Sequence, residues 1–141
     1  MKSKRHLVSL AALGAVAVLS LSACAGGAST GGSTNASGNY NISFIQGVAG
    51  DEFYITMQCG AQDEAKALGV TLNTQGPAKF DPTLQKPIVD SVAATKPNAL
   101  LIAPTDVTAM GAPIKAIASS GTKVVLVDTT LEDPSFAASQ I

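Results

Sequence analysis

The sequence has little charge and few residues of the types that most often carry catalysis or metal binding. Only 13% of its 141 residues are charged, and the formal net charge is −1. The basic residues form no stripe downstream of the N-terminus, so the electrostatic footprint of a nucleic-acid-binding protein is missing. The single histidine, His6, lies near the N-terminus, and we expect neither a metal site nor a cofactor. With 46% hydrophobic residues, the composition excludes a disordered chain and suits one modest α/β domain plus an apolar segment.

Cysteine is also scarce, and the two cysteines stand in different contexts. Cys24 ends an apolar run, whereas Cys59 sits inside a helical pattern. A disulfide between them would need an oxidising compartment. Separate roles explain them better, because Cys24 fits a processing signal and Cys59 fits a small buried helix residue.

Residues 1–24 are typical of an export signal. Lys2, Lys4 and Arg5 precede an apolar run over residues 7–21, which is short for a spanning helix of about 20 residues. The run ends in the four residues 21–24, Leu-Ser-Ala-Cys, which resemble the bacterial lipobox. The resemblance implies that Cys24 is acylated, becomes the new N-terminus and anchors the protein to the membrane outside the cytoplasm. The alternatives are an ordinary signal peptide cleaved near Cys24 and a retained transmembrane anchor.

Residues 25–39 (AGGASTGGSTNASGN) contain no charge and no large side chain. Such a segment buries too little apolar surface to offset its ordering entropy, so it is interpreted as a flexible tether. A phosphate-binding glycine loop is the rival interpretation. It is disfavoured because no strand precedes the segment and no lysine closes it.

Residues 40–141 show strands alternating with helices. Strands are expected at 40–46, 70–74, 99–103 and 123–127, and helices at 52–68, 82–96 and 107–120. Asp51 and Asp81 are expected helix caps, and Pro87 is expected to kink or restart the second helix. Residues 131–141 are expected to form a loop, with the start of another strand as an alternative. The alternation predicts an α/β fold, a flavodoxin-like or Rossmann-like parallel sheet with helices on both faces.

The apolar spacing predicts which helix residues face the core. The expected inward residues are Phe53, Met57, Ala61, Ala65 and Leu68 in the first helix, Leu84, Ile88, Val92 and Ala93 in the second, and Met110, Ile114, Ile117 and Ala118 in the third.

Polar and aromatic side chains follow the expected strands, at the edge where parallel sheets bind ligands. The candidates are Gln46, Gly50, Asp51, Phe53, Tyr54, Thr105, Asp106, Asp128 and Thr129. Carboxylates bind neighbouring hydroxyls, and an aromatic ring covers the C–H face of a sugar. Since no arginine or lysine was found at these strand ends, the set favours a neutral polyhydroxylated ligand. Asp51 and Asp106 also suit helix caps, and one of the two adjacent aromatics is expected in the core.

Several of these segments together are similar to the ribose-binding-protein branch of bacterial solute-binding proteins, which share a core with the lac-repressor family. The similar segments are ISFIQG (42–47), DEFY (51–54), GAQDEAKALGV (60–70), ALLIAPTD (99–106) and VVLVD (124–128). The resemblance implies a type I periplasmic-binding-protein fold, of which this chain would hold the N-terminal lobe only. It implies a substrate-binding component of an ABC importer, without enzymatic activity, that presents a sugar to a membrane permease.

The resemblance also assigns roles to individual residues. It implies that Phe53 and Tyr54 lie against the sugar, and that Asp51 and Asp128 contact its hydroxyls. Where the ribose binder has an arginine after the acid, Thr129 stands here, which argues against ribose itself. Asp106, in its structural turn, is carried over as a further candidate.

Two other functions are alternatives for this sequence. A sensor lipoprotein of the same fold would bind a sugar-like signal without a permease. An enzyme or phospho-acceptor would use Asp106 or Asp128, but it needs clustered acids, a lysine at a strand end and cytoplasmic phosphate donors. A transcription factor is excluded because no DNA-binding helix pair precedes the core.

Overall fold

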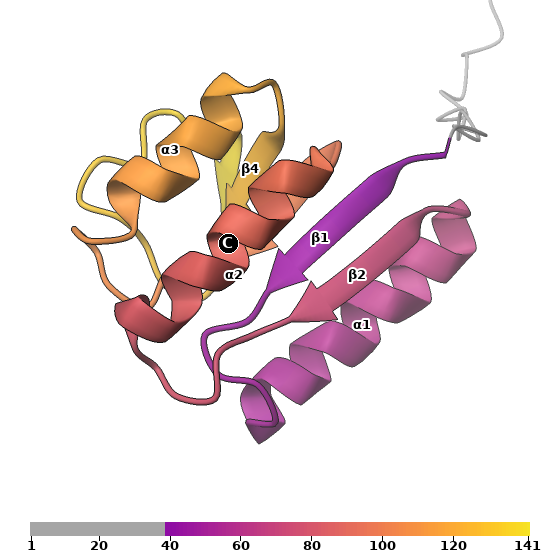
Figure 1. Ribbon diagram of the computed structural model, residues 1–141. Coiled ribbons are helices and arrows are strands. Elements are labelled where there is room, and N and C mark those ends of the chain that lie inside the picture. Colours follow the sequence, from indigo (N-terminus) through magenta and orange to yellow (C-terminus); the bar gives the residue numbers. More distant parts are fainter. Residues whose placement is uncertain (1–38) are drawn as a thin grey trace, which may run out of the picture. The chain divides into compact units, whose positions relative to one another are not determined.

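Five parallel strands form the centre of the fold, which a computed structural model describes for residues 39–141 (Figure 1). Their order in the sheet is β2-β1-β3-β4-β5. The strands are β1 (Asn41–Ile45), β2 (Thr71–Gln75), β3 (Ala99–Ile102), β4 (Lys123–Leu126) and β5 (Ser139–Gln140). β5 confirms the alternative prediction that another strand begins within residues 131–141. The predicted signal segment, the predicted acylation site Cys24 and the part of the predicted tether before Asn39 lie outside the described residues.

Three helices connect the strands: α1 (Glu52–Leu68), α2 (Pro82–Thr95) and α3 (Gly111–Ser119). Asp51 begins α1 by accepting a hydrogen bond from the Phe53 backbone N–H at 2.9 Å, and Gly69 ends it in the left-handed conformation. Asp81 begins α2 in the same way, accepting from the Thr83 N–H at 2.7 Å. The expected caps of these two helices are therefore present.

The third helix begins later than the predicted residue 107. The Asp106 carboxylate accepts hydrogen bonds from the backbone N–H groups of Thr108 (2.9 Å) and Ala109 (2.6 Å), which closes a turn before α3. Asp106 is thus a turn residue, and the residue that precedes α3, Met110, makes no side-chain cap. Pro113 falls in the first turn of α3, where a missing N–H costs no intrahelical bond.

The predicted restart of the second helix at Pro87 is not observed. α2 is one helix from Pro82 to Thr95 with Pro87 inside it. Proline removes a single backbone donor there. The burial of Val89 and Val92, which follow Pro87 in the same helix, supports the helix across that position.

Each face of the sheet carries its own apolar core, as expected for helices on both faces (Figure 1). α2 and α3 cover one face over a cluster that includes Ile45, Val89, Ile102, Ile114 and Leu126. α1 covers the other face, where the buried cluster is Phe44, Tyr54, Ala103 and Val127. The predicted α/β class with a parallel sheet is confirmed.

The buried face of α1 matches the prediction in its middle and differs at its ends. Ala65 is buried and Met57 packs against the core, as predicted. Phe53 and Leu68 are more than half exposed, and Tyr54 is buried in place of Phe53. Cys59, expected to be buried, is exposed.

The prediction for α2 is confirmed at Val92, which is buried, and at Ile88 and Ala93, which pack against the core. It is wrong at Leu84, which is exposed, and it missed the buried Gln85 and Val89. The prediction for the third helix was better: Met110, Ile114 and Ile117 are all buried. Among residues 39–141, no helix has both the length and the apolar character needed to cross a bilayer.

Candidate sugar site at the carboxyl edge of the sheet

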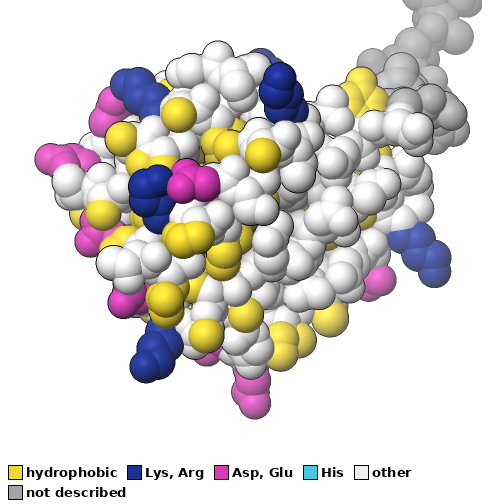
Figure 2. Space-filling view, viewed as in Figure 1, with side chains coloured by type: hydrophobic (Ala, Val, Ile, Leu, Met, Phe, Trp, Pro, Cys, Tyr) yellow, Lys and Arg dark blue, Asp and Glu magenta, His cyan; other side chains and the backbone are white. Residues whose placement is uncertain are grey.

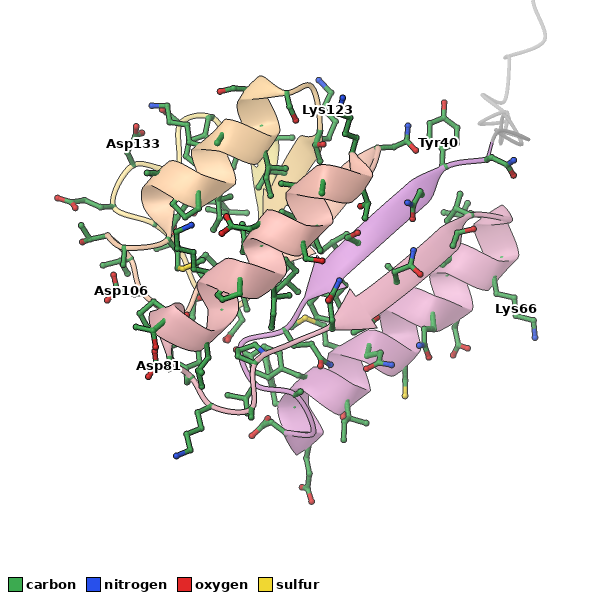
Figure 3. All side chains as sticks on the ribbon, in the orientation of Figure 1. Tyr40, Lys66, Asp81, Asp106, Lys123 and Asp133 are labelled. Atoms are coloured by element: carbon green, nitrogen blue, oxygen red, sulfur yellow. The ribbon has the colours of Figure 1, made fainter. Side chains whose placement is uncertain are left out.

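The carboxyl ends of all five strands meet at one edge of the sheet, because the strands are parallel. In Figure 3, Asp81 and Asp106 lie at this edge, whereas Tyr40 and Lys123 lie at the opposite one. The chain reverses its direction of travel across the sheet between β1 and β3. Ligands of open α/β sheets bind beside this switch point.

The side chain of Gln85, from α2, closes the crevice at the switch point. Its amide nitrogen donates to the carbonyls of Ala103 (2.8 Å) and Gln46 (3.3 Å), which follow β3 and β1. Its amide oxygen accepts from both the N–H and the hydroxyl of Thr105, each at 3.0 Å. Gln85 is fully buried. It joins the ends of β1 and β3, and because it is buried it leaves no exposed surface of its own for a ligand. Sequence reasoning missed this residue.

Tyr54 and Asp128 meet at this edge although 74 residues separate them. The Tyr54 hydroxyl donates a hydrogen bond to Asp128 Oδ2 at 2.7 Å. Burial of Tyr54 raises the pKa of its phenol well above the usual range, and the hydrogen bond to Asp128 and the charges of Asp128 and Asp51 raise it further. The phenol therefore stays protonated and holds one carboxylate oxygen of Asp128 in place.

Asp128 follows β4 in an unusual backbone conformation. Its φ is +63°, in the left-handed region, where aspartate is more frequent than most residues. Its N–H donates to the Ile141 carbonyl at 3.0 Å, which fixes the turn. The carboxylate is exposed and makes no ion pair with any residue in 39–141. The neighbouring Thr129 hydroxyl donates to the Pro104 carbonyl at 2.7 Å, so this predicted contact residue ties the β4 end to the β3 end.

The two adjacent aromatics have different environments. Phe53 and Tyr54 meet edge to face, with ring centroids 5.2 Å apart and planes at 79°. Tyr54 is only 5% exposed, while Phe53 is 54% exposed. The sequence predicts that one of these two aromatics lies in the core, and Tyr54 is that residue. Phe53 is the ring that a ligand can reach.

A third aromatic residue, Phe80, lies beside this pair and was not predicted. Gly47 has no room for a side chain, because an added Cβ would collide with the Tyr54 hydroxyl and lie 2.9 Å from Phe80 Cε2. Tyr54 and Phe80 thus converge on the same point, and Phe80 is 50% exposed. Its position just before the Asp81 cap, and so at the carboxyl edge, was the available signal.

Two of the predicted acids make local hydrogen bonds. Asp51 is exposed and caps α1, close enough to Tyr54 for its charge to act on the phenol. Backbone donors from Ala109 and Thr108 lower the pKa of Asp106, which is fully exposed in its turn. The structure brings Phe53, Tyr54, Asp128 and Asp51 together, and it gives Asp106 a separate structural task.

A lysine lies at the carboxyl edge of the sheet, where the sequence interpretation placed none. Hydrogen bonds from the Thr83 side chain and backbone lower the pKa of Asp81, and the charge of Lys79, in the loop after β2 at the same edge, lowers it a little further. The face shown in Figure 2 carries separated lysines among acidic side chains instead of a continuous basic patch. Within residues 39–141 no three His, Cys, Asp or Glu residues are grouped so as to hold a metal ion.

A groove of about 410 Å³ lies elsewhere, between α3 and the segment after β4. Lys115, Asp133 and Phe136 are among its lining residues, and Lys115 pairs with Asp133 at 3.4 Å. None of the predicted ligand-binding residues lines this groove. The candidate site lies on an open edge of the sheet and is defined by its hydrogen-bonded acid and aromatic side chains, not by an enclosed cavity.

Comparison with known proteins identifies the domain. Residues 42–140 match the family model described as a periplasmic binding protein domain. The chain belongs to this family. The matched range spans the whole sheet from β1 to β5, so the periplasmic binding protein domain includes every candidate site residue described above.

Solved structures similar to this periplasmic binding protein domain are solute-binding proteins of ABC transporters. One from Agrobacterium vitis, bound to α-D-tagatopyranose, is 43% identical with a TM-score of 0.65, and the match covers 66% of this chain and 31% of that one. One from Mycobacterium smegmatis, with bound glycerol, is 32% identical with a TM-score of 0.65, and the match covers 74% of this chain and 35% of that one. A carbohydrate transporter solute-binding protein from Agrobacterium radiobacter, in complex with D-arabinose, is 25% identical with a TM-score of 0.67. That match covers 72% of this chain and 34% of the other.

The chain spans about one third of the length of these solved proteins. Among curated proteins, none matches the sequence significantly. The resemblance to ribose-binding-protein-like sugar binders is confirmed by the family match and by these neighbours. Since the family and its neighbours are solute-binding proteins, the prediction that the periplasmic binding protein domain is not an enzyme is also confirmed.

Proposed function

We propose that this chain contributes a sugar-contacting lobe to an extracytoplasmic, lipid-anchored solute-binding protein that presents a monosaccharide or similar polyhydroxylated solute to an ABC permease. The observation that carries the proposal is the Asp128 carboxylate, held by Tyr54 beside the exposed ring of Phe53. The sugars named with the neighbouring structures, D-tagatose and D-arabinose, are in keeping with this chemistry.

The polar part of the proposed site is Asp128. Oδ2 already accepts from Tyr54, which leaves Oδ1 and the remaining lone pairs to accept from sugar hydroxyls. A carboxylate acceptor makes stronger hydrogen bonds than a neutral one. Because no cation pairs with Asp128 among the described residues, it prefers a hydroxyl-rich neutral ligand to an anion.

The apolar part is the exposed Phe53 ring, which covers sugar C–H groups by dispersion and removal of water. All of these residues lie on one open edge, so the ligand stays partly in water. We therefore expect affinity for the chain to be in the millimolar range, about −4 kcal/mol.

Ligand-observed NMR of the 141-residue chain with D-tagatose and D-arabinose tests the proposal. Asp128→Asn keeps the side-chain shape and the left-handed backbone but removes the charge. We expect it to weaken sugar binding about tenfold, because a hydrogen bond to a charged group contributes roughly 1–1.5 kcal/mol more than the neutral one that asparagine retains. Asp133→Asn, an equally conservative change in the distant groove, is the matched control and should bind like the wild type.

Two results would contradict the sugar assignment. One is the absence of saturation transfer to either sugar from the wild-type chain. The other is preferential binding of a sugar phosphate over the neutral sugar, which would point to Lys79 and an anionic ligand.

Lipid anchoring is tested separately, with the two cysteines as a matched pair. Cells that express the protein are fed an alkyne-tagged fatty acid. We expect Cys24→Ser to lose the label and to leave the membrane fraction. Cys59, exposed on α1 within the folded domain, should tolerate serine with the label unchanged. Label retained in Cys24→Ser, or lost in Cys59→Ser, would refute acylation at Cys24.

A further inference from the structure

Phe80 is held in place from both sides. Upstream, the loop after β2 is bonded to the loop after β1: the Ala49 N–H donates to the Pro77 carbonyl at 2.8 Å, and the Gln46 N–H donates to the Gln75 carbonyl at 2.9 Å. Figure 1 shows the two loops running beside each other at this edge. Downstream, the Asp81 cap and Pro82 begin α2 at once. The backbone of Phe80 therefore has little freedom, although half of its side chain is exposed.

The usual structural role for an apolar residue at this point does not apply to Phe80. A hydrophobic residue before a helix cap normally packs on the fourth helical residue in a hydrophobic staple. Here the fourth helical residue is Gln85, whose polar side chain is buried and bonded to Ala103, Gln46 and Thr105. Phe80 instead turns toward Gly47 and the hydroxyl end of Tyr54.

Two exposed rings thus border the Tyr54–Asp128 pair at different points. Phe53 meets the ring of Tyr54 edge to face, while Phe80 lies near its hydroxyl, which is bonded to Asp128. A ligand hydroxyl bound to Asp128 therefore has an apolar ring close to its own carbon skeleton. A closed sugar ring presents a continuous C–H face to such a surface, whereas an open-chain polyol does not.

We propose that Phe80 is a ligand-contacting residue that makes the site selective for ring-closed sugars over open-chain polyols. The inference rests on the proposed sugar-binding function and adds a class of substrate to it. It rests on a half-exposed ring beside the Tyr54 hydroxyl, and on the hydrogen-bonded Gln85 that stands where a hydrophobic staple partner would be.

The experiment compares D-arabinose, which is ring-closed, with D-arabinitol, its open-chain polyol, on the 141-residue chain by saturation-transfer NMR titration. Phe80→Leu keeps apolar bulk against Gly47 and Tyr54 but removes the ring. We expect it to weaken D-arabinose binding at least fivefold and to change D-arabinitol binding less than twofold. Phe80→Tyr, which restores a ring, should bind D-arabinose within twofold of the wild type.

The outcomes separate this inference from the function beneath it. If the wild type binds neither probe nor D-tagatose, the proposed function fails and the role of Phe80 fails with it. If the wild type binds D-arabinose and Phe80→Leu binds it equally well, only the role of Phe80 is overturned. An equal loss for D-arabinose and D-arabinitol would also overturn it, since that result indicates a general change in the fold. Leu84→Ala removes an exposed apolar side chain from α2 and serves as the control, so it should leave both affinities unchanged.

Discussion

Replacement of Gln85 by leucine is expected to lower the free energy of unfolding by about 3 kcal/mol. The leucine fits the buried volume but makes none of the four hydrogen bonds of the amide. The carbonyls of Ala103 and Gln46 and the N–H of Thr105 lose these partners in a buried place. Each buried polar group left without a partner costs about 1–3 kcal/mol, partly offset by the gain in apolar burial.

Urea denaturation followed by far-UV circular dichroism measures this loss. Gln62→Leu makes the same substitution on the exposed face of α1 and should change stability by less than about 0.5 kcal/mol. If the urea midpoint of Gln85→Leu equals that of Gln62→Leu, the hydrogen bonds of the Gln85 amide do not stabilise the ends of β1 and β3.

The second large effect is expected at Gly47. An alanine there would place its Cβ against the Tyr54 hydroxyl and 2.9 Å from Phe80 Cε2. Tyr54 cannot move aside cheaply, because it is buried and bonded to Asp128. Overpacking of this kind costs about 1–3 kcal/mol. We expect Gly47→Ala to destabilise the domain by about 2 kcal/mol and to break the Tyr54–Asp128 hydrogen bond, which would also weaken sugar binding.

Gly60 provides a control of opposite sign. It lies inside α1, and an added Cβ meets no atom within 4 Å. Glycine in a helix costs about 0.5–1 kcal/mol relative to alanine, so Gly60→Ala should raise the urea midpoint while Gly47→Ala lowers it. Similar shifts for both variants would show that the close approach at Gly47 has no energetic consequence.

The sequence was sufficient for the fold because its signals are local. β1, β3 and β4 appear as short runs rich in apolar residues. The starts of α1 and α2 depend on Asp51 and Asp81, each bonded to a backbone N–H only two residues away. The start of α3 was predicted less well. Asp106 has the same local chemistry, but it closes a turn instead of beginning a helix, and periodicity does not separate these outcomes.

The contacts within the candidate site could not be predicted in the same way. Gln85 is one polar residue on a helix, and its importance arises only when α2 lies over the ends of β1 and β3. Phe53 and Tyr54 are adjacent in sequence, and periodicity chose the wrong one for the core. The pairing of Tyr54 with Asp128 depends on the sheet order, because it joins residues that follow β1 and β4, and β3 lies between these two strands.

The left-handed backbone at Asp128 restricts how this position can vary. Asparagine and glycine adopt such a φ readily, whereas a β-branched or bulky residue is strained there. Relief of that strain would turn the peptide and pull the position 128 N–H away from the Ile141 carbonyl at the end of β5. An engineer who wishes to change the preferred solute should therefore leave residue 128 as a short polar side chain and diversify positions 53 and 80.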